Sequence, residues 1–186
     1  MQITETRIPA VKQIVPKKHG DARGYFMETF SAPIFAAAGI TESWVQDNQS
    51  LSGPKGTVRG LHFQIAPAAQ AKLIRVIQGA ILDVAVDLRH GSPTFGQHVA
   101  VELTADGGEQ LYVPAGFAHG FCTLAPDTAV AYKVSHVYAP AQDKGLRWND
   151  PALGIDWPVT EAEALLSAKD RQQPLLADLP AYFTYA

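Results

Sequence analysis

Short runs of β-branched and aromatic residues, broken every few positions by glycine or proline, fill the first 140 residues of the chain. Turn signals separate these runs at 53–54, 79, 91–93, 106–108 and 125–127. Many short strands at this spacing are typical of a β-sandwich or β-barrel. The expected strands cover 11–15, 25–30, 44–50, 58–63, 73–78, 81–88, 98–103, 110–113, 120–124 and 130–138. We therefore expect a mostly β protein.

Two of these runs alternate in a way that predicts which side chains share a face. Segment 81–88 places its aliphatic residues on one face and two aspartates on the other: Leu82, Val84, Val86 and Leu88 against Asp83 and Asp87. Segment 130–138 places Tyr132 and Tyr138 on one side. The first pattern predicts a barrel wall with one packed face, and the second predicts that Tyr132 points into the mouth of the barrel.

Two segments carry helix signals. Residues 31–39 begin with a serine cap, have a proline near the start and end at glycine. Residues 160–166 resemble a capping box, with Glu163 three positions after Thr160. We expect short helices at both places and a C-terminal helical tail, residues 159–186, that packs on the barrel. No linker separates the parts, so residues 1–186 are expected to form one domain.

Composition excludes several classes of protein. The chain has 186 residues, 47% hydrophobic and 18% charged, and a formal charge of −3. A net negative charge argues against nucleic acid as a partner, because proteins that follow phosphates carry a basic surplus. No apolar run approaches the roughly 20 residues that span a bilayer. Cys122 is the single cysteine, which fits a reducing compartment. The expected location is therefore the cytoplasm.

The first of two histidine motifs runs from Gly56 to Gly79. Its spacing resembles the first motif of the cupin family, a family of small β-barrels, and puts His62 at the first metal-ligand position. Gln64 stands where that motif has its second histidine, and Lys72 stands where it has glutamate. An amide and an ammonium group cannot replace imidazole and carboxylate around a divalent cation. A histidine base beside a cation suits organic acid–base chemistry instead.

The second motif is more complete. Gly108, five residues and then Pro114-Ala115-Gly116-Phe117-Ala118-His119 match the second cupin motif. This resemblance implies a cupin-like double-stranded β-helix, the jelly-roll barrel, with His119 across the barrel from His62. A metal site built on the two histidines alone stays open at this point, as does a purely structural role for each of them.

Further segments resemble the dTDP-4-dehydrorhamnose 3,5-epimerase family, the metal-free cupins of nucleotide-sugar biosynthesis. They occur in the family's order over about residues 7 to 175. The segments are 21–28 (DARGYFME), 46–50 (QDNQS), 56–64 (GTVRGLHFQ), 72–76 (KLIRV), 114–121 (PAGFAHGF), 132–134 (YKV), 147–151 (RWNDP), 155–158 (IDWP) and 166–170 (LSAKD). Each segment alone is weak, but their joint order is specific.

The resemblance implies an epimerase that inverts C3 and C5 of dTDP-4-dehydro-6-deoxy-D-glucose through an enolate. Inversion needs a base on one face of the carbon and an acid on the other. His62 resembles the base, Asp170 its partner in a dyad, and Tyr132 the acid on the opposite face. Lys72 would stabilise the developing oxyanion at C4. No cofactor and no metal are implied.

The resemblance also implies a set of substrate contacts. Arginines suit the diphosphate because their forked N–H groups match phosphate oxygens. The implied diphosphate ligands are Arg23 and Arg59, and Tyr138 would stack on the thymine. The remaining implied contacts are Glu28, Gln46, Asp47, Asn48, His119, Asp143 and Lys169. Asp143 departs from the family, which often has the longer glutamate there.

The family forms homodimers in which an N-terminal strand crosses to the partner, so Arg23 and Glu28 are expected to complete the neighbouring site. Three alternatives remain open. One is a mono-epimerase acting at C3 or C5 of a related dTDP-4-keto-6-deoxy sugar. The others are a metal-dependent cupin and a non-catalytic sugar-binding barrel.

Overall fold

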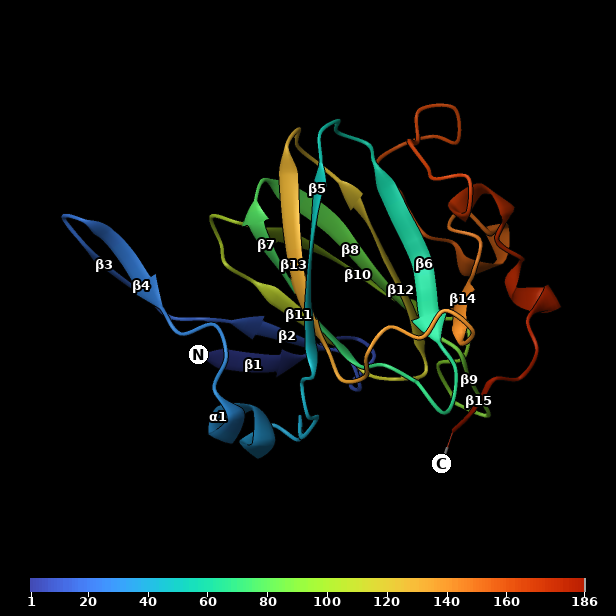
Figure 1. Cartoon of the computed structure of the whole chain (residues 1–186), viewed down its shortest axis with the longest axis horizontal. Coiled ribbons are helices and arrows are strands. Elements are labelled where there is room, and N and C mark those ends of the chain that lie inside the picture. Colours follow the sequence, from blue (N-terminus) through green and yellow to red (C-terminus); the bar gives the residue numbers. More distant parts are fainter. Residues whose placement is uncertain (186) are drawn as a thin grey trace.

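The computed structural model describes residues 1–185, and two antiparallel sheets form its body (Figure 1). The six-stranded sheet has the order β1 (Gln2–Glu5), β2 (Lys12–Val15), β11 (Gln110–Val113), β7 (Lys72–Gln78), β13 (Thr128–Val134) and β5 (Gln46–Ser52). The five-stranded sheet has the order β10 (His98–Thr104), β8 (Ala80–Asp87), β12 (Phe117–Thr123), β6 (Val58–Gln64) and β14 (Asp143–Gly145). The expectation of a mostly β, jelly-roll-like protein is confirmed.

The remaining elements are short. β3 (Lys18–Asp21) and β4 (Gly24–Met27) form a hairpin that projects from the body, as Figure 1 shows. β9 (Arg89–His90) pairs with β15 (Phe183–Thr184), close to the C-terminal end. α1 (Ala32–Ala37) follows the hairpin, as the sequence predicts. Three single-turn 3-10 helices follow β14: η1 (Pro151–Leu153) precedes the tail, and η2 (Asp170–Gln172) and η3 (Leu176–Asp178) lie in it. No helix among the described residues is long and apolar enough to cross a membrane.

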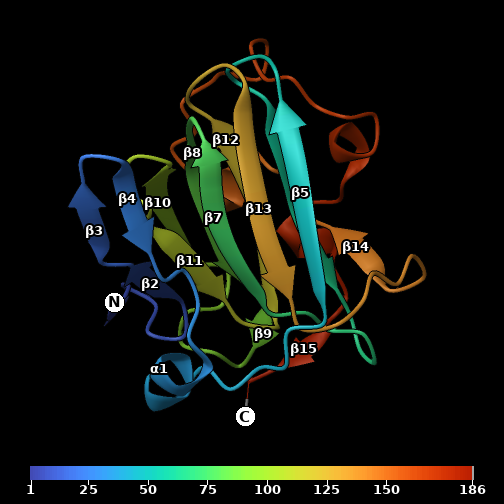
Figure 2. The ribbon, with the colours of Figure 1, turned by 60° about the vertical axis from the view of Figure 1, so that its left-hand side comes forward.

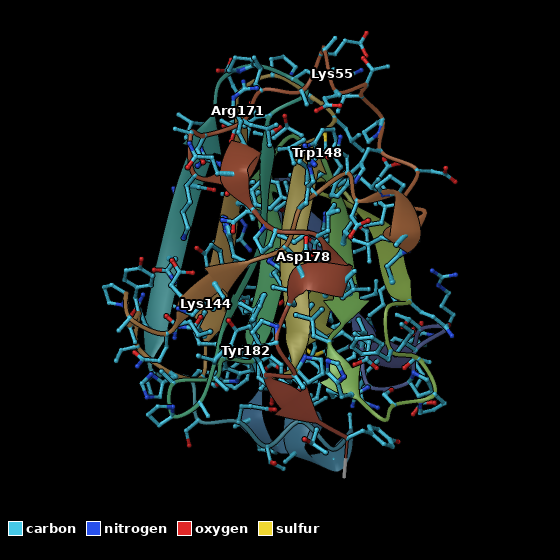
Figure 3. All side chains as sticks on the ribbon, turned by 90° about the vertical axis from the view of Figure 1, so that its right-hand side faces the viewer. Lys55, Lys144, Trp148, Arg171, Asp178 and Tyr182 are labelled. Carbon is cyan, nitrogen blue, oxygen red and sulfur yellow. The ribbon has the colours of Figure 1, made fainter. Side chains whose placement is uncertain are left out.

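The main apolar core lies between the two sheets. Both sheets contribute to it, for example Ile74 and Val130 from one and Ala85 and Phe121 from the other. A second cluster covers the outer face of the five-stranded sheet, where Leu153 and the tail residues Leu176 and Tyr182 pack against the strands. Figure 3 shows this tail in front of the strands. On the outer face of the six-stranded sheet, a third cluster packs Phe35 of α1 against Leu73 and Tyr112, while Leu51 and Ile77 stay exposed.

This arrangement corrects the prediction that segment 81–88 packs on only one face. The aliphatic face of β8 packs under the tail, and the opposite face carries Ile81 and Ala85 into the main core. Asp83 and Asp87 are therefore both fully buried. Asp87 is held by Arg89 and by two hydroxyl groups at 2.7 and 2.6 Å. Aspartates at alternate positions of a strand therefore indicate an exposed face only when nothing packs against that face of the sheet.

The predicted helix at 160–166 was wrong. The capping contacts do form, since Glu163 Oε2 accepts hydrogen bonds from the backbone and hydroxyl of Thr160. The chain then turns instead of propagating a helix, because Leu165 pairs with the edge of β6 through Val58 and Gly56. Edge pairing and burial of Ala164 outweigh local helix propensity here. The last predicted strand is also shorter, since β13 ends at Val134 rather than at Tyr138.

An irregularity in β6 decides what points into the barrel. β12 pairs His119 with His62 and Phe121 with Arg59, so β6 has two residues where β12 has one. Residues that face each other across antiparallel strands share a face. Phe121 belongs to the inner core, so Arg59 and His62 both lie on the inner side. In a regular strand, residues three positions apart lie on opposite faces, so without the irregularity Arg59 and His62 would point in opposite directions.

Two glycines make this bulge possible. Gly60 has a φ of +124°, and a Cβ there would lie 2.6 Å from Gly120 Cα. A Cβ on Gly120 would lie 2.6 Å from Arg59 O and 3.0 Å from Leu61 Cδ2. The two strands can therefore approach at this point only because neither residue carries a side chain.

We expect Gly120→Ala to lower the free energy of unfolding by about 2 kcal/mol or more, because the methyl group meets backbone atoms that cannot move freely. Urea denaturation followed by circular dichroism measures the change. Gly53→Ala is the matched control, since its nearest contact would be Asp127 Oδ1 at 4.0 Å. Equal stability of the two variants would contradict the account of the bulge.

Candidate active site

The candidate site is a cavity of about 160 Å³ at the open side of the barrel. Its walls come from β7, β13 and β5, which lie side by side in Figure 2, and from β6 and β14 of the other sheet. The residues that line it are Gln46, Asn48, His62, Phe63, Gln64, Gln70, Lys72, Tyr132, Tyr138 and Asp143. We call it the central cavity. Seven of the residues named from the sequence therefore line one space: Gln46, Asn48, His62, Lys72, Tyr132, Tyr138 and Asp143.

His62 is paired with a carboxylate far away in the sequence. Its Nε2 lies 2.5 Å from Asp170 Oδ1, and the Asp170 side chain is only 4% exposed. η2 begins at Asp170, and the Asp170 backbone N–H donates to Ser167 Oγ at 3.1 Å. Burial raises the pKa of Asp170. Hydrogen bonds from His62, Ser167 and the Gly60 backbone together lower it by more than burial raises it, so the net shift is downward. The carboxylate therefore stays ionised beside the imidazole.

The tail contacts the edge of β6, and this contact brings Asp170 next to His62. β14 pairs with residues 62–64, and Leu165 pairs near Thr57, so a gap in the pairing remains around Gly60. Asp170 fills that gap with its carboxylate, which accepts from the Gly60 backbone. A bulged edge strand leaves backbone groups that need partners, and here one partner is also the partner of His62.

Lys72 lies on the inner side of the barrel next to His62. It is buried, and its Nζ donates to His62 O at 3.1 Å. Burial lowers the pKa of Lys72 to about 8, while the carboxylates of Asp143 and Asp83 act in the opposite direction. The ammonium group is thus still charged near neutral pH and has few competing partners, which suits a group that interacts with a developing negative charge.

His119 forms a second buried pair that sequence reasoning missed in part. Its Nε2 lies 2.7 Å from Asp83 Oδ1, with Asp83 fully buried. Burial lowers the pKa of His119 against the opposing effect of Asp83, and nearby Lys72 and His62 lower it further. Asp83 Oδ2 is buried and has no hydrogen-bond partner among the described residues. Asp83 lies two residues before Ala85, which pairs with His119 in the sheet, and the sequence does not show this pairing between strands.

Tyr132 lines the central cavity from β13. It is half-buried there, and its neighbours on the strand, Ala131 and Lys133, line a separate cavity of about 320 Å³ on the outer face of the sheet. Burial raises the pKa of its hydroxyl, and Arg59 opposes that shift. The phenol therefore holds its proton at neutral pH. The expectation that Tyr132 points into the mouth of the barrel agrees with its place in the cavity wall.

Tyr138, Asp143 and Lys169 form a cluster at the rim. The Tyr138 hydroxyl donates to Asp143 Oδ2 at 3.0 Å, and Lys169 Nζ lies 2.5 Å from the same oxygen. Although Asp143 is shorter than the glutamate common in the family, it reaches both partners. The contact joins the tail to the segment that follows β13.

Other residues named from the sequence lie away from the central cavity within this chain. Arg23 is 89% exposed at the tip of the β3–β4 hairpin and pairs with Asp21. Glu28 follows the same hairpin and is not part of the cavity wall. Asp47 lies on the outer face, where it pairs with Lys133 at 3.0 Å. Arg59 is close to the site, and it lines a groove of about 390 Å³ together with Asp170.

Arg59 is held in place from β5. Its Nε donates to Ser52 Oγ at 3.0 Å, and one terminal nitrogen donates to Leu51 O at 3.1 Å. A guanidinium group has five N–H donors, so this anchoring leaves donors for an anion. Within residues 1–185, no three His, Cys, Asp or Glu side chains gather as a group that could hold a metal ion.

A jelly-roll barrel that brings a His–Asp pair, a buried lysine and a protonated tyrosine around one cavity defines an acid–base enzyme of the cupin type. The family model described as dTDP-4-dehydrorhamnose 3,5-epimerase matches residues 5–178. The chain belongs to this family of isomerases.

Individual relatives agree with the family model. A dTDP-4-dehydrorhamnose 3,5-epimerase of Sinorhizobium fredii is 52% identical over 185 residues, which cover 100% of this chain and 94% of the relative. The crystal structure of a dTDP-6-deoxy-D-glucose-3,5-epimerase from Legionella pneumophila, in complex with dTDP-4-keto-L-rhamnose, superposes with a TM-score of 0.94. It is 43% identical and covers 100% of this chain and 98% of its own. A dTDP-4-dehydrorhamnose 3-epimerase of Streptomyces niveus is 37% identical over 99% of this chain and 91% of its own length.

Proposed function

We propose that this protein inverts C3 and C5 of dTDP-4-dehydro-6-deoxy-D-glucose to give dTDP-4-dehydro-L-rhamnose, in the synthesis of dTDP-L-rhamnose. The observation that carries the proposal is that His62, Lys72 and Tyr132 line one cavity, with Asp170 bonded to His62 behind it. The more similar of the relatives named above supports inversion at both carbons, since it is a 3,5-epimerase at 52% identity, against a 3-epimerase at 37%.

The chemistry follows from the ketone at C4. A C–H bond beside a carbonyl is acidic because the carbanion is stabilised as an enolate. His62 removes the proton, and the Asp170 carboxylate stabilises the resulting imidazolium and keeps its ring oriented. The enolate oxygen at C4 gains negative charge next to the Lys72 ammonium group. Tyr132 then gives its hydroxyl proton to the opposite face of the carbon.

The cycle closes by two proton transfers with solvent. The tyrosinate regains a proton, and the imidazolium loses one. One such cycle at C5 and one at C3 invert both carbons. The pKa of His119 is lowered and its Nε2 is bonded to Asp83, so the neutral ring offers Nδ1 as an acceptor for a hydroxyl group of the sugar.

The proposed nucleotide contacts lie around the central cavity. Tyr138 at the rim offers an exposed ring on which the thymine stacks. Arg59 binds the diphosphate with its remaining donors, and Gln46 and Asn48 contact the sugar or nucleoside from β5. Asp143 and Lys169 contact it from the rim. Asp47 reaches this ligand only by leaving its pair with Lys133.

We further propose a cytoplasmic homodimer in which the β3–β4 hairpin crosses to the partner. The hairpin projects from the body and exposes Tyr25 and Phe26, which are 58% and 72% exposed. The six-stranded sheet leaves Leu51 and Ile77 uncovered on its outer face. Apolar side chains of this size on a projecting arm and an open sheet face favour burial against a second copy. Arg23 and Glu28 would then complete the partner's site.

The proposed reaction is tested by incubating the keto sugar with the protein in D₂O. NMR should show deuterium at both C3 and C5 of the product. Incorporation at one carbon alone would assign the protein as a mono-epimerase, and no incorporation would contradict an epimerase altogether.

Asp170→Asn should keep the fold but reduce kcat by about 10²–10⁴-fold, because an amide leaves the imidazolium without its counter-charge. Steady-state kinetics with the keto sugar measures the loss. Asp178→Asn, in the next turn of the same tail, is the matched control and should retain wild-type kcat. A kcat within twofold of wild type in Asp170→Asn would remove the dyad from the mechanism.

The pH profile should report Lys72. Its ammonium form stabilises the oxyanion, and burial lowers its pKa to about 8. Activity should therefore fall as the pH rises through about 8, where the proton is lost. In Lys72→Arg the charge persists, since the guanidinium pKa exceeds about 12, and this limb should vanish from the residual activity. A limb near pH 8 that survives in Lys72→Arg belongs to another group.

Subunit mixing tests the crossing hairpin. Arg23→Ala and His62→Ala chains should each be impaired alone, yet a mixed dimer should regain activity. One of its two sites would combine His62 from one chain with Arg23 from the other. If both residues serve the same chain's site, each site in the mixed dimer stays damaged and activity does not return.

A further inference from the structure

The segment 136–139 carries Tyr138 but has no strand to hold it. β13 ends at Val134, and the chain then runs along the rim of the central cavity. Tyr138 itself is 57% exposed, so packing of its ring does not fix its position. The backbone of this segment must therefore be held by something other than a sheet.

One buried glutamine holds the segment on both sides of Tyr138. Gln64 Nε2 donates to Val137 O at 3.2 Å and to Ala68 O at 2.8 Å. Gln64 Oε1 accepts from the backbone N–H of Ala139 at 2.8 Å. The side chain is buried, with 4% of the residue exposed. Both amide hydrogens and the amide oxygen are thus bonded to backbone groups of this chain.

Two further glutamines continue the pattern. Gln46 Oε1 accepts from the backbone N–H of Tyr138 at 3.0 Å. Gln70 Nε2 donates to His136 O at 2.5 Å. Each of the four residues in segment 136–139 therefore has a backbone group bonded to a glutamine side chain. We call Gln46, Gln64 and Gln70 the glutamine clamp.

Only an amide fits the place of Gln64. The site presents two carbonyl oxygens and one N–H group, so it needs two donors and one acceptor on one side chain. A carboxylate would set oxygen against the carbonyl oxygens, and an imidazole has too few groups. This is the position where the sequence motif of metal-binding cupins has its second histidine. In this chain the amide of Gln64 bonds to Ala68 and to segment 136–139, so it offers no free ligand atom to the cavity.

We propose that Gln64 is a positioning residue for the nucleobase. With Gln46 and Gln70 it fixes segment 136–139 so that the Tyr138 ring is already oriented for stacking before the nucleotide arrives. This inference rests on the proposed function, in which thymine stacks on Tyr138. Fixing the ring in advance lowers the entropy lost on binding, so the clamp strengthens ground-state binding of the nucleotide more than it changes the chemical step.

Gln64→Met tests the proposal because methionine keeps the length of the side chain and removes its hydrogen bonds. Base–aromatic stacking contributes to the affinity for a nucleobase, so losing its preorganisation should raise the Kd for dTDP roughly 5- to 20-fold. The Kd for inorganic pyrophosphate should not change, since the proposed contact of Tyr138 is with the base and not with the diphosphate. KM for the keto sugar should rise more than kcat falls. Isothermal titration calorimetry and steady-state kinetics measure these quantities.

A double-mutant cycle with Tyr138→Ala separates positioning from general loss of structure. Once the ring is gone, Gln64→Met should weaken dTDP binding by less than twofold further. Gln97→Met is the control, since its amide also donates to a backbone carbonyl, Pro93 O, on a loop outside the cavity wall. It should leave the Kd for dTDP unchanged.

The outcomes are distinguishable. If Tyr138→Ala leaves the Kd for dTDP unchanged, the proposed stacking fails. If Tyr138→Ala weakens binding but Gln64→Met does not, the clamp is overturned. Additive losses in the cycle, or equal losses for dTDP and pyrophosphate, would overturn it as well. Gln70→Met removes a half-buried member of the clamp and should show a smaller effect of the same kind, so it provides the same test if Gln64→Met does not fold.

Discussion

The close approach of Gly60 and Gly120 is the constraint on which the rest of the site depends. It allows one extra residue in β6, and that residue changes which side chains face inward. Arg59 and His62 then share the inner side, with His62 directly across from His119. Without the bulge, the residue proposed to bind diphosphate and the residue proposed to act as base would face away from each other. A backbone irregularity thus places the two ends of the ligand on one surface.

The same irregularity gives the C-terminal tail its place. The gap in pairing beside Gly60 is filled by the Asp170 carboxylate, which also bonds to His62. The tail covers the outer face of the five-stranded sheet with apolar side chains, and this packing carries Asp170 to the edge of β6. Hydrophobic burial on the outside of the barrel therefore supports the hydrogen-bonded pair of His62 and Asp170 at the rim of its interior. Lys169, one residue earlier, joins the tail to the rim segment through Asp143.

Sequence patterns predicted much of this architecture, because strand runs, turn residues and motif spacing are local. His62, Lys72 and Tyr132 could be assigned to one cavity from motif spacing and resemblance, and they do line one. The partner of His119 was missed, since strand alternation alone cannot show that both faces of β8 are covered. Residues 160–166 were predicted to form a helix because the pairing of Leu165 with β6, which prevents it, is a long-range contact. Gln64 was seen as the loss of a metal ligand, and its backbone partners around residue 138 could not be known before the fold.

The central claim is that His62 and Tyr132 act on the same carbon from opposite faces. Tyr132→Phe in D₂O tests it most directly, because this variant keeps the base and loses the acid. We expect protons at C3 and C5 of the keto sugar to exchange with solvent while the original configuration is largely retained, as NMR of the recovered sugar would show. Inversion of both carbons by Tyr132→Phe at the wild-type rate would contradict the account.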